Sequence, residues 1–172
     1  MQHTIVRNVS RMISTVMVVI IAGMWHTAVA QTDTLTIEST AGAPGQLQLA
    51  NISLTNTQQI AGLQLTLKMD AKTVIIDTVN TTVRTDGMMV QWNAQNGKIL
   101  MIDFALKNMI DPGDGPILSI RYYVASTAAA KAVKIAAEGV VLSNPDGRAV
   151  PVIVENGQFV INASSTPDHK PD

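Results

Sequence analysis

Apolar and polar residues alternate along the segment QIAGLQLTLKMD, residues 59–70. The apolar positions are Leu63, Leu65, Leu67 and Met69. The intervening polar positions are Gln64, Thr66 and Lys68. Because successive side chains of a β-strand point to opposite faces, this period predicts a strand with one buried face and one exposed face.

Similar short apolar segments recur between turn-forming residues along the rest of the chain. They are TLTIES, GQLQLANISLTN, KTVIIDTV, MMVQWN, KILMIDFAL, ILSIRYYVA, AVKIAAEGVVL and AVPVIVENGQFVIN. Asn96-Gly97, between MMVQWN and KILMIDFAL, predicts a tight turn. Eight or nine short strands at this spacing predict an all-β fold, an antiparallel β-sandwich or barrel.

Two segments carry apolar residues at both parities. In GQLQLANISLTN the apolar positions change register between Leu49 and Ile52, which predicts a β-bulge near Ala50-Asn51. In KILMIDFAL we place three side chains in the core: Leu100, Ile102 and Phe104. The same alternation then turns three side chains toward solvent: Ile99, Met101 and Asp103. Two apolar residues on an exposed face are typical of an interface.

The first thirty residues resemble a cleavable signal peptide. Arg7 and Arg11 precede an apolar run of about 13 residues, which is shorter than the ~20 that span a membrane. The small-residue pattern Ala28-Val29-Ala30 predicts cleavage before Gln31. We therefore expect a secreted or cell-surface protein with a signal peptide at 1–30, a folded domain at 33–162 and a disordered polar tail at 163–172.

Composition narrows the chemistry that the domain can perform. The chain has no cysteine and a formal net charge of −1 without a basic block, which argues against disulfides and nucleic-acid binding. Its three histidines lie in the leader or the tail, so a Ser-His-Asp triad or a histidine zinc site is not expected. Paired carboxylates could still hydrolyse glycosides, and the candidates are Asp70, Asp77, Asp103 and Glu138. Since Asp103 is predicted to point outward, we expect no enzyme.

Neither a metal site nor a row of sugar-stacking rings is predicted. The acidic segments DPGDG and NPDG are explained by turn chemistry. The period places Phe104, Phe159 and Trp92 in the core, and adjacent Tyr122 and Tyr123 face opposite sides. Direct carbohydrate binding through an exposed Trp92 or tyrosine is therefore the alternative function, beside a purely structural surface protein.

Read in order, these segments resemble the cohesin family, the receptor modules of cellulosome scaffolding proteins. GQLQLANISLTN is similar to the family's early G-x-x-x-x-V-x-V-x-L-x-N strand, and QIAGLQLTLKMDAKTVIIDTV to I-A-G-F-x-F-x-L-x-Y-D-P-x-V-L. NGKILMIDFAL, GPILSIRYYV and VVLSNPDGRAVPVIVENGQFVIN resemble later segments in the same order. The resemblance covers about residues 33–162.

The resemblance implies a nine-stranded jelly-roll sandwich that binds dockerins, which are small calcium-dependent helical modules of secreted proteins. Gly62 and Gln64 stand where many cohesins carry Asn and Asp, so the specificity of those cohesins is not carried over. Our predicted partner-binding residues are Gly62, Gln64, Thr66, Lys68, Ile99, Met101 and Asp103. Calcium is expected on the dockerin, and no cofactor is expected on this chain. The implied role is a non-catalytic module of extracellular polysaccharide degradation, without a membrane span after signal cleavage.

Overall fold

The structure, a computed structural model, describes residues 32–163. The predicted signal peptide and residues 164–172 of the predicted tail lie outside this range. The strands are β1 (Asp33–Ile37), β2 (Thr40–Gly42), β3 (Leu47–Thr55), β4 (Gly62–Lys68), β5 (Val74–Thr81), β6 (Met89–Trp92), β7 (Lys98–Ile102), β8 (Pro116–Val124), β9 (Lys131–Ser143), β10 (Ala149–Val150), β11 (Val152–Glu155) and β12 (Gly157–Ile161). A 3-10 turn, η2 (Val83–Thr85), precedes β6. Within 32–163, no helix is long and apolar enough to cross a membrane.

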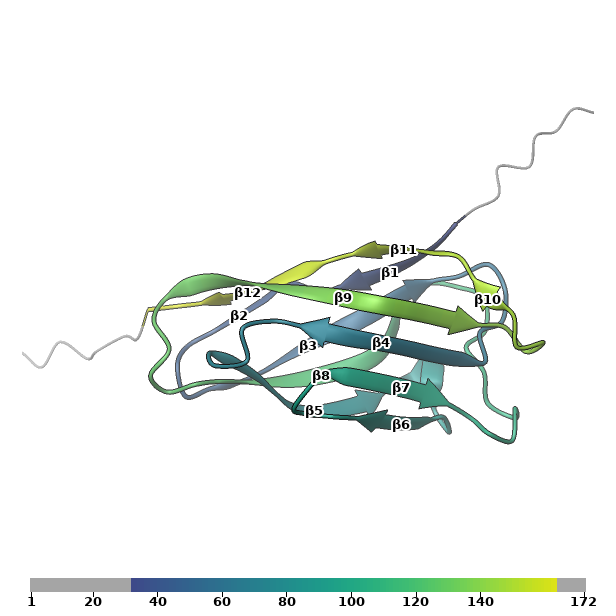
Figure 1. The fold of residues 1–172 in the computed structure, drawn as a ribbon, viewed down its shortest axis with the longest axis horizontal. Helices are drawn as coiled ribbons and strands as arrows, with labels where there is room; N and C mark the ends of the chain where they lie inside the picture. The colour runs from purple at the N-terminus through teal and green to yellow at the C-terminus, as the bar shows by residue number, and fades with distance from the viewer. Residues whose placement is uncertain (1–31, 164–172) are drawn as a thin grey trace, which may run out of the picture. The chain divides into compact units, whose positions relative to one another are not determined.

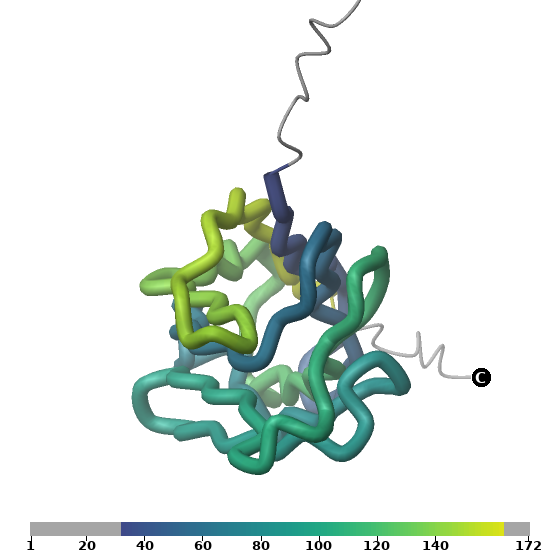
Figure 2. Tube along the Cα trace, turned by 90° about the vertical axis from the view of Figure 1, so that its right-hand side faces the viewer, coloured from purple at the N-terminus to yellow at the C-terminus, as the bar shows by residue number. Residues whose placement is uncertain are grey.

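The strands form two sheets that pack face to face, which confirms the predicted β-sandwich. One sheet has the order β11-β1-β3-β8-β5. The other has the order β2-β12-β9-β4-β7-β6, with β10 paired to β9. In Figure 1, β9, β4 and β7 lie side by side in one layer, with β3 and β8 in the layer behind them. Figure 2 looks along the strands and shows the loops that join the layers at one end.

The last predicted segment, AVPVIVENGQFVIN, which ENG interrupts in the sequence, forms the three strands β10, β11 and β12. Pro151, which has no backbone N–H to donate, separates β10 from β11. At Asn156 the chain changes sheets, so that β11 pairs with β1 and β12 pairs with β9. β11 and β12 run parallel to β1 and β2, whereas the other strand pairs are antiparallel. These divisions, together with the short strand β2, which the pattern did not predict, account for twelve strands in place of the predicted eight or nine.

The core lies between the sheets and follows the predicted period along β4. Leu63, Leu65 and Leu67 are buried, as predicted. Tyr122 and Phe159 meet edge to face with their ring centroids 5.9 Å apart. Such an aromatic contact stabilises a core beyond the area that the rings bury.

The predicted bulge near Ala50-Asn51 is wrong. Along β3 the alternation continues unbroken, with Ala50 buried in phase with Ile52 and Leu54. Leu47 and Leu49 consequently lie on the outer side of the sheet, 52% and 62% exposed. The small side chain of Ala50 fills a core position that the sequence pattern had assigned to the leucines. The irregularity between β3 and β8 falls later, between Ile52 and Ser53.

Arg84, on η2, joins three loops at one end of the sandwich. Its Nη1 donates to the carbonyl oxygens of Leu54 at 2.6 Å and Gly115 at 3.0 Å. Its Nη2 donates to Asn56 Oδ1 at 2.7 Å and to the carbonyl oxygen of Asp111 at 2.9 Å. Burial lowers the pKa of this guanidinium, although it stays charged at any physiological pH. A planar group with donors on both terminal nitrogens suits this arrangement of four acceptors.

Candidate functional site

The outer face of β9, β4, β7 and β6 is the candidate binding surface, and we call it the front face. Its outward side chains are Met89, Gln91, Gln64, Thr66, Lys68, Leu100, Ile102, Glu138 and Val141. Gln64, Thr66 and Lys68 point outward on β4, as predicted, because the leucines between them point into the core.

On β7 the predicted parity is wrong. Ile99 and Met101 are fully buried, and Leu100 and Ile102 lie on the front face. The strand is apolar at both parities, so its alternation alone could not choose the buried side. Pairing chooses it, because Ile99 stands opposite Leu65 and Met101 opposite Leu63, which are core residues of β4. Ile99 and Met101 therefore cannot touch a partner in the folded domain.

The front face has two apolar side chains at its centre: Leu100 lies between Gln64 and Gln91, and Ile102 lies beside Met89. One cross-strand row consists of Val141, Gln64, Leu100 and Gln91. The next row consists of Ser143, Gly62, Ile102 and Met89. Val141 and Met89, at the two sides, are 47% and 48% exposed. A flat sheet surface of mixed apolar and amide groups is suited to protein binding.

Gly62 supplies flatness rather than a contacting side chain. It is buried, and a Cβ atom at this position would lie 2.9 Å from Ser143 Oγ and 3.9 Å from Ile102 Cδ1. Ile102 and Ser143 therefore close over the glycine from the two neighbouring strands. The predicted role of Gly62 as a contact residue remains a prediction.

A β-bulge in β9 shapes one side of the front face. Gln64 pairs with Val141 and Thr66 pairs with Glu138, so two residues, Gly139 and Val140, stand opposite Leu65. Gly139 has φ +58°, a left-handed conformation that glycine adopts without strain. The extra residue changes the parity of β9, and as a result both Val141 and Glu138 point outward.

Asp103 lies one residue beyond β7 and organises the turn that follows. Its carboxylate accepts backbone N–H groups of Ala105 at 2.9 Å, Lys107 at 3.0 Å and Asn108 at 2.8 Å. These hydrogen bonds, chiefly the one from the Ala105 backbone, lower the pKa of Asp103. Asp103 is thus fixed in a turn at the end of the front face, instead of standing on the strand as predicted.

Comparison with known proteins supplies the family. The family model described as the cohesin domain matches residues 34–161. This match spans most of the chain. The chain belongs to the cohesin family. No curated protein matches it in sequence.

Solved cohesins share the fold at low sequence identity. The sixth cohesin of scaffoldin B from Acetivibrio cellulolyticus, solved with a Cel5 dockerin mutant, is 16% identical, with a TM-score of 0.66 over 77% of this chain and 100% of that one. The cohesin of the Coh-OlpC–Doc435 complex from Clostridium thermocellum is 15% identical, with a TM-score of 0.66 over 77% of this chain and 95% of that one. A non-cellulosomal cohesin from the archaeon Archaeoglobus fulgidus is 18% identical, with a TM-score of 0.65 over 77% of this chain and 92% of that one.

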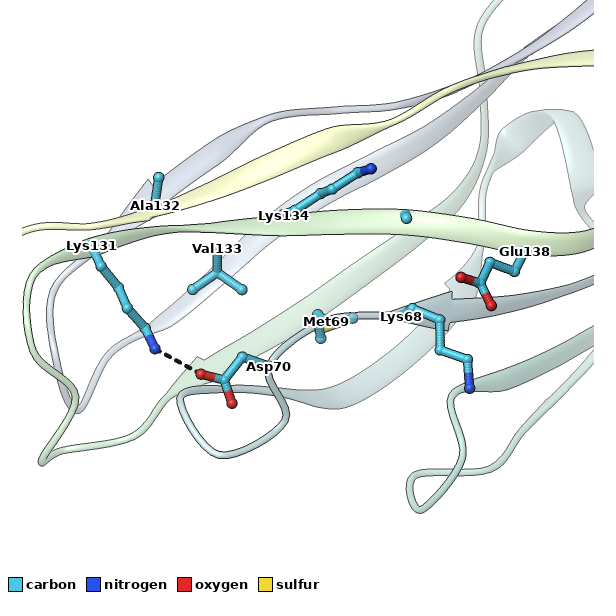
Figure 3. A pocket seen from close by; sticks show the side chains of 9 residues that line it. Lys68, Met69, Asp70, Lys131, Ala132, Val133, Lys134 and Glu138 are labelled. Atoms are coloured by element: carbon cyan, nitrogen blue, oxygen red, sulfur yellow. Dashed lines mark hydrogen bonds and ion pairs between the residues drawn. The ribbon is translucent and has the colours of Figure 1, made fainter.

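A shallow hollow adjoins the front face where β4 ends beside β9 in this cohesin (Figure 3). The Lys131 side chain reaches from β9 to Asp70, and its Nζ lies 2.7 Å from Asp70 Oδ2. The hydrogen bond from Lys131, followed by that from the Lys72 backbone, lowers the pKa of Asp70. The pair ties the turn after β4 to the start of β9.

Three of the four carboxylates considered for catalysis have structural partners in the described chain, and the fourth, Glu138, points outward on the front face. Asp70 pairs with Lys131, and Asp77 pairs with Arg121, whose hydrogen bond lowers the pKa of Asp77. Asp103 holds its turn. Within 32–163 there is also no group of three or more His, Cys, Asp or Glu side chains that could bind a metal.

The aromatic residues of the cohesin domain are placed as predicted, with one exception. Phe159 and Tyr122 are buried, and Trp92 points inward, partly buried against the core. Phe104 is 75% exposed, so its predicted core position is wrong. β7 ends at Ile102, and the alternation that placed Phe104 inside does not extend into the turn. Its exposure could not be found from the period of the sequence.

Proposed function

We propose that this cohesin is an exported, non-catalytic adhesion module that binds a dockerin-bearing protein through its front face. The partner is proposed to be a secreted protein of extracellular polysaccharide degradation. Membership of the cohesin family supports the proposal, as do the matched cohesins that were solved in complex with dockerins.

The observation that carries the proposal is that Leu100 and Ile102 point outward at the centre of the front face, where each is partly exposed. Leu100 and Ile102 are apolar, and the cross-strand neighbours of Leu100 are the polar Gln64 and Gln91. Apolar side chains with polar ones around them are typical of a protein interface. Direct glycan binding has less support, because Trp92 points into the sandwich and no row of exposed rings occurs within residues 32–163.

The test is capture from the secreted fraction of the source organism, with the purified protein as bait, in calcium and in excess chelator. A captured protein that carries paired calcium-loop repeats should then bind as a purified module in isothermal titration calorimetry. Leu100→Asp should weaken that binding at least about tenfold, since it places a charge at the centre of the interface.

The matched control is Leu49→Asp, because Leu49 is an exposed leucine on the opposite sheet. It should leave the affinity unchanged. Absence of any calcium-dependent partner would overturn the proposal. Equal losses from the two variants would overturn the assignment to the front face.

A further inference from the structure

The turn formed by residues 103–108, which we call the Phe104 turn, displays two large apolar side chains. Phe104 is 75% exposed and Leu106 is 47% exposed. Among the aromatic residues of the described chain, Phe104 is the most exposed. Neither side chain contributes to the core, so packing does not account for their presence in a turn.

The backbone of this turn is held firmly by hydrogen bonds. Besides the three backbone N–H groups bound to the Asp103 carboxylate, Asn108 Nδ2 donates to Asp103 Oδ2 at 3.0 Å. The backbone N–H of Leu106 donates to the carbonyl oxygen of Asp103 at 3.0 Å. The apolar side chains are therefore presented on a preorganised backbone, which lowers the entropy lost when they bind.

Leu106 itself is in a conformation that its side chain disfavours. Its φ is +51°, and it is the one non-glycine residue with positive φ in the described chain. A left-handed conformation is strained for a residue that carries a Cβ atom. Glycine would fit this position without strain, so a leucine here points to a use for its side chain.

The turn lies at one end of the front face. It follows Ile102 of β7 directly along the chain, and Ile102 pairs with Met89 on the neighbouring strand β6. Asn108 Nδ2 also donates to the carbonyl oxygen of Gly87 at 3.2 Å, two residues before Met89. Continuity along β7 and this bond to the start of β6 place the turn beside the apolar row of Ile102 and Met89.

We infer that Phe104 and Leu106 form an apolar anchor that extends the front face and packs against apolar side chains of a helix in the dockerin-type partner. The inference rests on the proposed function. The anchor is a contact specific to this chain, and it selects partners that carry apolar groups at the matching end of their helix. A partner with charged groups there would lose hydration without compensation and would bind weakly.

The probe is the purified calcium-loaded module obtained by capture, titrated calorimetrically into the full protein. Phe104→Ala should weaken binding about tenfold or more, as expected of a buried aromatic anchor. Leu106→Gly should also weaken binding, while its stability to urea stays equal to or above that of the wild type, because the substitution relieves the left-handed strain. Leu49→Ala, which removes an exposed leucine from the opposite sheet, should change neither quantity.

The outcomes separate the two proposals. Failure of the wild-type protein to bind any calcium-dependent module overturns the proposed function and the anchor with it. Binding by the wild type that survives undiminished in Phe104→Ala and Leu106→Gly overturns the anchor alone. If Leu49→Ala lowers the affinity as much as Phe104→Ala does, the anchor is also overturned, because the effect would then not depend on where the apolar side chain lies.

Discussion

Arg84 Nη2 lies 2.7 Å from Asn56 Oδ1, and this contact joins the turn before β6 to the end of β3. The same guanidinium serves the carbonyl groups of Leu54, Asp111 and Gly115. One side chain therefore provides donors for loops that are distant in sequence. Its removal takes a charged donor from all four acceptors, although Gly115 O still accepts from the Leu54 backbone N–H and Asp111 O from Asn56 Nδ2.

Arg84→Met is expected to lower the free energy of unfolding by about 2–4 kcal/mol, since partly buried acceptors lose charged donors. Arg84→Lys should be little more stable than Arg84→Met, because an ammonium group cannot reproduce the planar arrangement of donors on a guanidinium. Urea denaturation measures both effects. Arg148→Met, at an exposed turn, is the control and should stay within about 0.5 kcal/mol of the wild type. Equal stability of the Arg84 and Arg148 variants would contradict the structural role of Arg84.

Two glycines with nearly the same φ should respond differently to substitution by alanine. Gly97 has φ +74° and Gly147 has φ +75°. A Cβ atom on Gly97 would clash with the carbonyl oxygen of Leu67, whereas a Cβ atom on Gly147 has nothing within 4 Å. Gly147→Ala should cost about 1–2 kcal/mol, the conformational penalty alone, and Gly97→Ala clearly more. Equal midpoints in urea denaturation would show that the turn at Gly97 moves freely.

The same substitution at two neighbouring residues of β7 should have very different effects on the free energy of unfolding. Met101→Asp places a charge in the core and should cost more than about 4 kcal/mol or prevent folding. Leu100→Asp places the same charge on the front face and should cost about 1 kcal/mol or less. Circular dichroism with thermal and urea denaturation distinguishes the two. The opposite order would restore the parity expected from the sequence.

Asp103 should make the stability of its turn depend on pH. Its pKa is lowered in the folded protein, chiefly by the backbone N–H of Ala105 and then that of Asn108. Because the folded pKa lies below the unfolded value near 3.9, this stabilisation is fully present above about pH 4 and is lost as the pH falls through the folded pKa.

The stability difference between the wild type and Asp103→Asn should therefore shrink as the pH is lowered from about 5 to about 2. NMR titration of the Asp103 carboxyl should give a midpoint below about 3.9. Asp70 and Asp77 remain in both proteins and serve as an internal reference. A difference that stays constant over this pH range would mean that the carboxylate does not hold the turn.

Alternation in the sequence predicted the parts of this cohesin in which one face is apolar and the other polar. β4 is such a strand, and its buried leucines and exposed Gln64, Thr66 and Lys68 lie as predicted. The tight turn at Asn96-Gly97 also lies where turn chemistry placed it, and Gly97 N donates to Asn93 O at 2.9 Å. The all-β sandwich follows from repeated signals of this kind.

The errors occurred where both faces of a strand are apolar. Ile99, Leu100, Met101 and Ile102 give no contrast between the core and the front face, and only pairing with β4 decides between them. Leu47 and Leu49 were wrongly predicted to face the core, because the adjacent core position is occupied by an alanine, which is a weak apolar signal. Phe104 was misplaced because the end of β7 depends on the hydrogen bonds of Asp103, which are not visible as a period. An apolar residue on a binding surface is thus the kind that alternation assigns least well.

The change of sheets at Asn156 determines when folding can finish. β11 adds the edge strand beside β1, and β12 fits between β2 and β9, so residues 152–161 complete both sheets. A chain emerging from its N-terminus would leave β1 and β2 without these neighbours until its final strands arrived. Pairings between the first and last strands have the large sequence separation that slows folding. Closure of the sandwich is therefore a late event, and the growing chain stays open until almost the whole domain has been made.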